Sequence, residues 1–229
     1  MAACSLAVKS QSTTDGTSFA TGAWTPAAND LLLAFVVASG TVATGSFSTS
    51  AGTTFTKVTS ALKNTSADTI YCFIANALSS ASSQTATFDC TGDSATGACI
   101  TVIAISGMTR TGASAIKQSK VISNQASATP AITFDTSALT GNPTLGVIGN
   151  ATQPPGLTPP TSWTEINDDG YLTPATGIET VSRDSGFTGT TITWGSSSGT
   201  AWGGIIVELD ASAISTAIAN SLMLLRCGT

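Results

Sequence analysis

Residues 31–38 read LLLAFVVA, and residues 99–105 read CITVIAI. Each run has about the length of one β-strand, and neither alternates apolar with polar residues as a strand with one solvated face does. Ser39 and Gly40 follow the first run, and Ser106 and Gly107 follow the second, so both end at residues that favour turns. The two runs therefore predict central strands of a sheet that is covered on both faces.

Other short runs rich in Val, Ile, Thr, Phe and Trp surround these two. The strands expected from this pattern are Leu31–Ser39, Phe55–Ser60, Thr69–Leu78, Thr85–Cys90, Ala98–Ser106, Ala131–Phe134, Thr144–Asn150, Ser162–Asn167, Gly177–Arg183, Thr190–Trp194 and Trp202–Leu209. Many short strands separated by turns are typical of a sandwich or barrel and not of alternating strands and helices. The fold class expected is all-β.

The order of these strands repeats along the chain. Phe55 and Trp163 are 108 residues apart, whereas Phe88 and Ile192, like Ile105 and Leu209, are 104 apart. A five-strand unit alone buries too little apolar surface for a stable domain. We therefore expect the halves, about 20–108 and 128–210, to pack as one jelly-roll-like two-sheet sandwich over residues 20–210. Chance similarity between β-rich segments is the alternative.

Three segments fall outside this repeat. Residues 1–19 are rich in Ser and Thr and are expected to form an N-terminal arm, and the polar Thr109–Ser127 is expected to connect the halves on the surface. Residues 211–229 are expected to form a short C-terminal helix or arm, because apolar residues recur there at helical spacing. Its apolar stripe would bind a partner or a groove of its own domain; the stripe residues are Ile214, Ile218, Leu222 and Leu225.

The composition excludes several classes of function. The chain has no histidine, which removes Ser-His-Asp and Cys-His nucleophile pairs and every histidine-containing metal site. Only 9% of residues are charged, the net charge is -5, and no basic stripe exists for a nucleic acid. No apolar run is long enough to span a membrane, and no secretory signal is visible at the N-terminus. The sequence therefore predicts a soluble protein that is synthesised in the cytoplasm.

The carboxylates offer two weak candidate sites. Glu165 and Glu179 lie on successive expected strands and could form the acid pair of a glycosidase, although Glu165 matches the exposed position of Lys57 in the repeat. The segment Asn167–Gly170 could bind calcium, but it lacks the spacing of a specific calcium loop and reads more simply as a turn. We expect no catalytic residue, metal or cofactor.

Cysteines and tryptophans are expected to be mainly structural. Five cysteines occur without CxxC pairs, and we expect most of them to be free and buried, with Cys90–Cys99 as the one bridge left open. Three of the four tryptophans fall in expected core strands. Trp24 precedes the first strong strand and is the tryptophan expected to be exposed and to contact a partner.

Four pieces of the chain carry a resemblance to a loosely defined group of phage and bacterial β-sandwich proteins. They are Trp24–Phe35, Ile103–Gly107, Ser162–Ile166 and Thr190–Leu209. The resemblance implies a non-enzymatic accessory protein of a tailed-phage virion: a capsid decoration or cement protein, a head fibre or a tail component. It also implies other virion proteins as partners, among them the major capsid protein, and an oligomer of the chain itself. A carbohydrate-binding adhesin or tail-associated receptor-binding module is the alternative.

Overall fold

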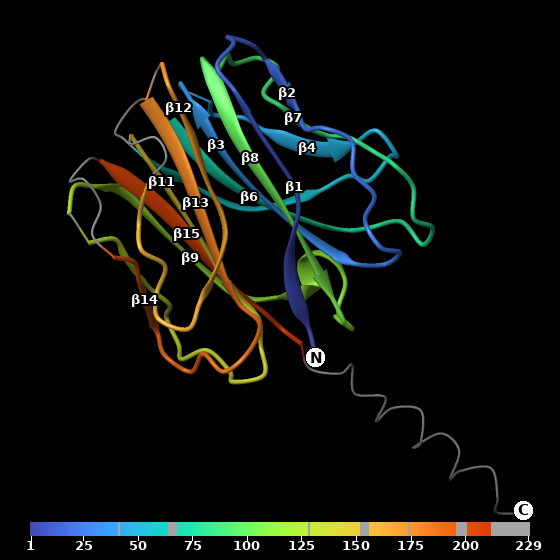
Figure 1. Cartoon of the computed structure of the whole chain (residues 1–229), viewed down its shortest axis with the longest axis vertical. Helices are drawn as coiled ribbons and strands as arrows, with labels where there is room; N and C mark the ends of the chain where they lie inside the picture. The colour runs from blue at the N-terminus through green and yellow to red at the C-terminus, as the bar shows by residue number, and fades with distance from the viewer. Residues whose placement is uncertain are drawn as a thin grey trace, which may run out of the picture.

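The structure is a computed structural model, and it describes residues 1–40, 42–63, 68–127, 129–151, 156–173, 175–195 and 201–211. The expected all-β class is confirmed, and the strands form two large and two small antiparallel sheets (Figure 1). The strands of the first half are β1 Ala3–Ser12, β2 Ser18–Ala20, β3 Leu31–Ser39, β4 Ser46–Thr49, β5 Thr56–Leu62, β6 Asp68–Asn76, β7 Ala86–Asp89 and β8 Gly97–Ser106. After a 3-10 turn, Gly112–Ala115, the second half contains β9 Ile116–Gln125, β10 Ala131–Thr133, β11 Thr144–Asn150, β12 Thr164–Leu172, β13 Ala175–Arg183, β14 Thr191–Thr193 and β15 Trp202–Leu209.

The two large sheets confirm the internal repeat. The first sheet has the strand order β1-β8-β3-β6-β5, and the second, read from β9, has the order β9-β15-β11-β13-β12. Each strand of one sheet thus has a counterpart at the same place in the other. The pairing of β5 with β6 shifts register between Lys57 and Thr59, and that of β12 with β13 shifts between Glu165 and Asn167. The repeat therefore extends to the position of a β-bulge.

A small sheet covers the outer face of each large sheet. In the first half this cover is β2-β7-β4, and in the second it is β10-β14. The backbone N–H of Phe55 donates to Phe47 O at 3.0 Å, which links β4 to the start of β5. Eight strands in two facing sheets with Greek-key connections make the first half a jelly roll, and the second half is a shorter version of it.

The core has three layers, one between the large sheets and one under each cover. Alternate residues of β3 enter different layers: Leu33 and Phe35 face the second sheet, whereas Leu32 and Val36 face the first cover. All nine residues of β3 and nine of the ten in β8 are buried. The unbroken apolar runs are thus explained by two covered faces, whereas β14, with both ends exposed and Ile192 buried, has one solvated face.

The arm expected over residues 1–19 is replaced by sheet structure. β1 pairs with β8 from Ala3↔Ser106 to Ser12↔Ala98, and its counterpart β9 lies within the segment expected to be a surface connection. Both are edge strands with polar side chains and register shifts, so they lack the apolar run or regular alternation that marks a strand in sequence. The expected C-terminal helix or arm lies outside the described residues except for residue 211.

Candidate functional site

Trp24 does not occupy the exposed position expected of it. Its side chain is buried in the layer between the first sheet and its cover, and its backbone exchanges hydrogen bonds of 2.9 and 2.8 Å with Gln84. These bonds extend the small sheet beyond β2 and place the Trp24 side chain in the core. The expectation that Trp24 is exposed and contacts a partner is therefore wrong. The other expected contact residues, Ile214, Ile218, Leu222 and Leu225, lie outside the described residues.

Trp163 is the more accessible tryptophan. It is half-buried and packs edge-on against Phe187, with ring centroids 5.4 Å apart. Trp194 and Trp202 are 1% exposed, as expected of core residues. The counterpart of Trp163 in the first half, Phe55, is buried against Phe47 of β4, and the described part of the second half has no strand in the place of β4.

Asn167–Gly170 is part of strand β12 and forms no turn. Asn167 Nδ2 donates to Thr101 Oγ1 at 2.9 Å across the sheet interface, and Asp169 Oδ2 lies 3.3 Å from Lys9 Nζ on β1. Asp168, between them, points to the opposite face. The calcium loop considered from the sequence is therefore wrong, because its oxygens diverge. Within the described ranges, no group of three or more acidic, cysteine or histidine residues is placed to hold a metal ion.

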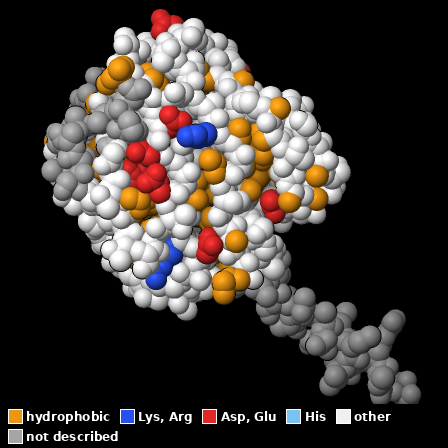
Figure 2. Space-filling view, in the orientation of Figure 1, with side chains coloured by type: hydrophobic (Ala, Val, Ile, Leu, Met, Phe, Trp, Pro, Cys, Tyr) orange, Lys and Arg blue, Asp and Glu red, His pale blue; other side chains and the backbone are white. Residues whose placement is uncertain are grey.

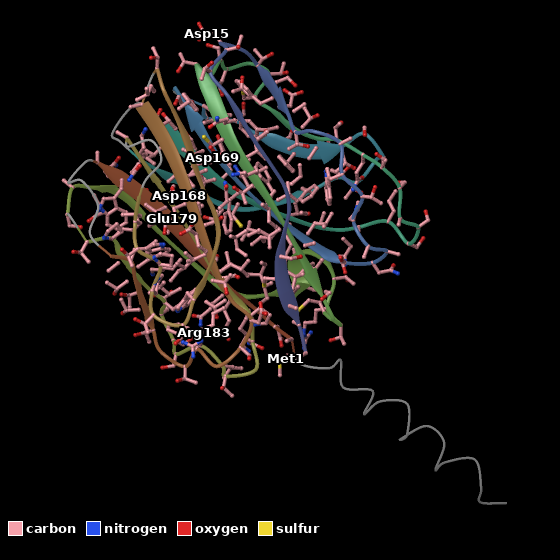
Figure 3. All side chains as sticks on the ribbon, in the orientation of Figure 1. Met1, Asp15, Asp168, Asp169, Glu179 and Arg183 are labelled. Carbon is pink, nitrogen blue, oxygen red and sulfur yellow. The ribbon has the colours of Figure 1, made fainter. Side chains whose placement is uncertain are left out.

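Asp168 instead forms a carboxyl pair with Glu179. The two residues lie directly opposite each other on β12 and β13, so they share the outer face of the second sheet (Figure 3). Directly opposite residues have Cβ atoms about 4.5–5.5 Å apart. Glu179 is 0% exposed although it carries a carboxyl group. The second sheet therefore contains two neighbouring acids where the core requires apolar groups.

The segment that follows the proline-rich loop lies on these acids. The Leu157 N–H donates to Glu179 Oε2 at 3.0 Å, and the Gly156 N–H hydrogen-bonds to the Asp168 carboxylate. Gly156 has a φ of 61°, a left-handed conformation that glycine adopts without strain. The remaining oxygens, Glu179 Oε1 and Asp168 Oδ1, are buried without a hydrogen-bond partner. Each acid thus uses one oxygen to hold the loop and leaves one unused.

Burial and mutual repulsion change the protonation of this pair. Burial is the main cause that raises the pKa of Glu179 to about 8, and the charge of Asp168 and then that of Glu165 add to it. Burial also raises the pKa of Asp168, against the Gly156 N–H, which lowers it. Glu179 is consequently protonated at neutral pH.

The glycosidase pair considered from the sequence is not the pair that the sheet brings together. Glu165 lies opposite Val181 and is exposed, whereas the partner of Glu179 across the strands is Asp168. The β-bulge between Glu165 and Asn167 sets this register. No local sequence pattern reveals this register. The internal repeat is the one signal that could have found the pair, because its offset of 108 residues relates Asp168 to Ser60 and Glu179 to Tyr71, and Ser60 and Tyr71 lie opposite each other in the first half.

A second polar group joins the two large sheets. Ser39 Oγ lies 2.7 Å from the Tyr171 hydroxyl and 2.6 Å from Thr176 Oγ1, so the first sheet is hydrogen-bonded to the second. Lys63 Nζ donates to Thr176 Oγ1 at 3.4 Å and forms a buried ion pair with Asp68. Every one of these side chains has a partner, so the group is a structural clasp between the halves. No sequence pattern indicates this group, because its members are far apart in the chain.

The described cysteines are free. Cys99 faces the layer between the large sheets, and Cys90 lies in the layer under the first cover, so the one bridge left open by the sequence is ruled out by their opposite sides of β8. Burial raises the pKa of the Cys99 thiol to about 12 and is also the main cause that raises that of Cys90. Both thiols stay protonated and inert at neutral pH. Cys227 lies outside the described residues.

A shallow hollow beside β4 and β7 does not add a binding site. It is lined by Thr44, Gly45, Ser46, Asp89 and Thr91. Asp89 accepts hydrogen bonds from the backbone and hydroxyl of Thr91, and Asp93 nearby accepts the N–H groups of Ala43 and Thr44. These carboxylates are occupied in holding their own turns.

Comparison with known proteins adds no family to this description. Neither a scan against models of protein families nor a search of curated proteins finds a match to the chain. Among the described residues, none of the helical structure has the length and apolar character to span a bilayer. Any functional assignment therefore depends on the geometry above.

Proposed function

We propose that this chain is a non-enzymatic structural protein of a tailed-phage virion that decorates or cements the capsid through protein–protein contacts. The observation that carries the proposal is the pairing of two jelly rolls through their large sheets. Jelly rolls recur in viral capsid proteins and in lectins, so the fold favours these two classes without deciding between them. The sequence resemblance to virion accessory proteins favours the first.

The edges of the large sheets support a protein that joins neighbours by its loops and ends. Each of the four edge strands, β1, β5, β9 and β12, has a register shift and at least one charged residue. Bulges and charges at an edge oppose strand-to-strand addition of another chain. Contacts with other subunits are therefore expected at the loops, the covers and the C-terminal segment.

The surface is also suited to immobilisation against other proteins. Charged side chains are few on the face seen in Figure 2, in keeping with a charged fraction of 9%. Free proteins usually have about 25% charged residues, and the charges help to keep them apart. A sparse charge pattern lowers the electrostatic cost of packing many copies side by side on a particle. We propose that copies of the chain also form an oligomer there.

The C-terminal stripe provides the test of this proposal. We expect that deletion of residues 211–229 leaves the described strands folded but abolishes incorporation into purified particles, because the four apolar side chains would anchor the chain to a neighbour. Incorporation is measured by quantitative mass spectrometry of particles, and cryo-EM locates the chain on capsid or tail.

A matched control separates lost contacts from lost chain length. Replacing Thr216 and Asn220, which lie between the stripe positions, by Ser and Gln should leave incorporation unchanged. Replacing Ile218 and Leu222 by Ser should reduce it as the deletion does. Unchanged occupancy of the truncated chain would remove the C-terminal anchor, and absence of the chain from every particle would remove the virion role.

A carbohydrate-binding adhesin remains the second candidate because of one observation. The half-buried Trp163–Phe187 pair lies at the end of the second half, beside the segment 156–160. Aromatic rings at loop ends are common sugar contacts, but a binding cleft also needs converging polar groups. Glycan-array binding that is lost in Trp163→Ala and kept in Trp24→Phe, together with a tail-tip location, would favour this candidate over cementing.

A further inference from the structure

The repeat identifies a carboxyl pair that the fold does not require, in which Glu179 is buried and Asp168 is half-buried. The offset of 108 residues that relates Phe55 to Trp163 also relates Tyr71 to Glu179 and Ser60 to Asp168. Ser60 pairs with Tyr71 on β5 and β6, as Asp168 pairs with Glu179 on β12 and β13. The first half thus has Ser60 and Tyr71, a hydroxyl and an aromatic ring, at the positions that Asp168 and Glu179 occupy in the second half.

The unused oxygens of the pair indicate a shared proton. Two ionised carboxylates would place two negative charges side by side, and neither Glu179 Oε1 nor Asp168 Oδ1 has a donor. One proton on the pair removes one charge and supplies the missing O–H donor. A metal ion is a weaker explanation, because no third acidic, cysteine or histidine residue joins the pair within the described ranges.

The other charged groups around the pair supply no counter-charge to Glu179, although Lys9 acts weakly on Asp168. Glu165 on β12 adds negative charge, and Lys9 on β1 forms its ion pair with Asp169. Arg183 on β13 directs its guanidinium to the carbonyls of Ser185 and Gly186. On β11 the residue opposite Glu179 is Ile148, and Leu157 covers the pair from outside. An added negative charge at Glu179 would therefore stand without compensation.

We propose that Asp168 and Glu179 share one proton and act as a pH-dependent latch, which holds the Gly156–Leu157 segment on the second sheet and releases it when the proton is lost at alkaline pH. Glu179 Oε2 holds the Leu157 N–H, and Leu157 itself is buried in the layer under the second cover. Once both acids are charged, water must reach the buried carboxylate of Glu179. Lifting Leu157 is the shortest way to admit it, because that residue lies directly on Glu179. The latch does not depend on the proposed virion role.

Amide hydrogen exchange of the full chain tests the latch. Between pH 6.5 and pH 9.5, the exchange of Gly156 and Leu157, corrected for its intrinsic pH dependence, should rise at least about tenfold, since one pKa unit is a tenfold change in population. Amides of β3 should show no such rise. Equal corrected exchange at both pH values would overturn the proposal.

Two variants separate the latch from general alkaline loosening. Glu179→Gln keeps an acceptor for Leu157 N–H and supplies an N–H donor for Asp168, so its loop should stay protected at pH 9.5. Glu165→Gln, at an exposed position outside the pair, keeps the pair itself, so its loop should still open by pH 9.5; the midpoint should move only slightly to lower pH, because the Glu165 charge that raises the pKa of Glu179 is gone. A loop that opens equally in Glu179→Gln would contradict the latch.

Direct titration keeps the proposal testable if Glu179→Gln does not fold. Carbon-13 NMR of the side-chain carboxyls should show Glu179 titrating near pH 8, whereas two independent titrations below pH 5 would overturn a shared proton. Calcium and magnesium chloride serve as the cation probes at pH 9.5. Protection of Gly156 and Leu157 by either ion at micromolar concentration, reversed by chelator, would replace the shared proton by a cation site.

Discussion

The two halves of the chain share a strand order but differ in what covers their outer faces. The first half has a three-stranded cover with packed aromatic rings, in which Tyr71 and Phe88 have centroids 5.4 Å apart and Phe47 and Phe73 5.6 Å. The second half has a two-stranded cover, the segment 156–160 and a carboxyl pair. Large sheets that face each other restrict sequence on both, whereas the covers face solvent and can diverge. The divergent cover is therefore where a specific role is most readily found.

Substitutions at the interface between the halves should cause the largest loss of stability. Asp68→Ala leaves the Lys63 ammonium, whose side chain is 3% exposed, buried without its carboxylate. We expect a loss of about 3–5 kcal/mol in the free energy of unfolding, measured by urea denaturation. Replacing both residues, as Lys63→Met with Asp68→Leu, should recover most of that loss, since no charge is then left unpaired. A loss below about 1 kcal/mol in Asp68→Ala would show that the ion pair, which positions Lys63 against Thr176 of the second half, contributes little to the interface.

The strands at the centre of the large sheets could be predicted from the sequence, whereas two edge strands and two short strands of the first cover could not. All the strands expected from apolar runs are present, and Leu31–Ser39, Thr144–Asn150 and Trp202–Leu209 have the expected bounds. Such strands can be recognised in the sequence because burial on both faces favours long apolar runs. The strands β1 and β9 were missed because edge strands are free to carry Lys, Ser and Gln, and β2 and β4 were missed because they are too short for a periodic pattern.

The candidate site could be predicted only in part, for a different physical reason. Glu179 and Asp168 were both visible as acids, but their pairing depends on a β-bulge that shifts the register by one residue. A one-residue shift moves a side chain to the other face of the sheet, so without the bulge Asn167 and not Asp168 would lie opposite Glu179. The exposure of Trp163 likewise depends on the absence of a β4 counterpart in the described residues, which its own local sequence does not reveal.

The pH dependence of stability sharpens the contrast between Tyr71 and Glu179. The pKa of Glu179 is raised to about 8 in the folded chain from an ordinary value of 4.5, so the folded state binds the proton more tightly. The free energy of unfolding should therefore be highest below about pH 4.5 and fall as pH rises to about 8, by at most about 1.4 kcal/mol per pH unit. Glu179→Gln should remove this slope. Urea midpoints at half-unit pH steps measure it, and equal slopes in both proteins would contradict the burial argument.

The counterpart of Glu179 in the first half should show a smaller, pH-independent effect. The Tyr71 hydroxyl donates to Val42 O at 2.6 Å, and Thr69 Oγ1 donates to the same oxygen at 3.0 Å. Because Val42 O keeps one donor in Tyr71→Phe, the loss should be about 0.5–1.5 kcal/mol at every pH between 5 and 9. Thermal unfolding across that range measures it. A pH-dependent loss would mean that the first half also contains a titrating group at this corner.

Substitutions in the edge strands should cause the smallest change in stability. They test why the large sheets do not pair with strands of another chain. Lys9 on β1 and Asp169 on β12 form a partly exposed ion pair 3.3 Å long, and such pairs contribute about 0.2–1 kcal/mol. Lys9→Leu should therefore cost no more than this, yet it removes the charge from an edge whose protection otherwise depends on its bulge between Leu6 and Val8. We expect self-association of Lys9→Leu in sedimentation velocity at high concentration, whereas Lys9→Arg, which keeps the charge, should sediment as the unmodified chain does. If Lys9→Leu also sediments unchanged, the bulge alone protects this edge, and the charge there serves only to bridge the two halves.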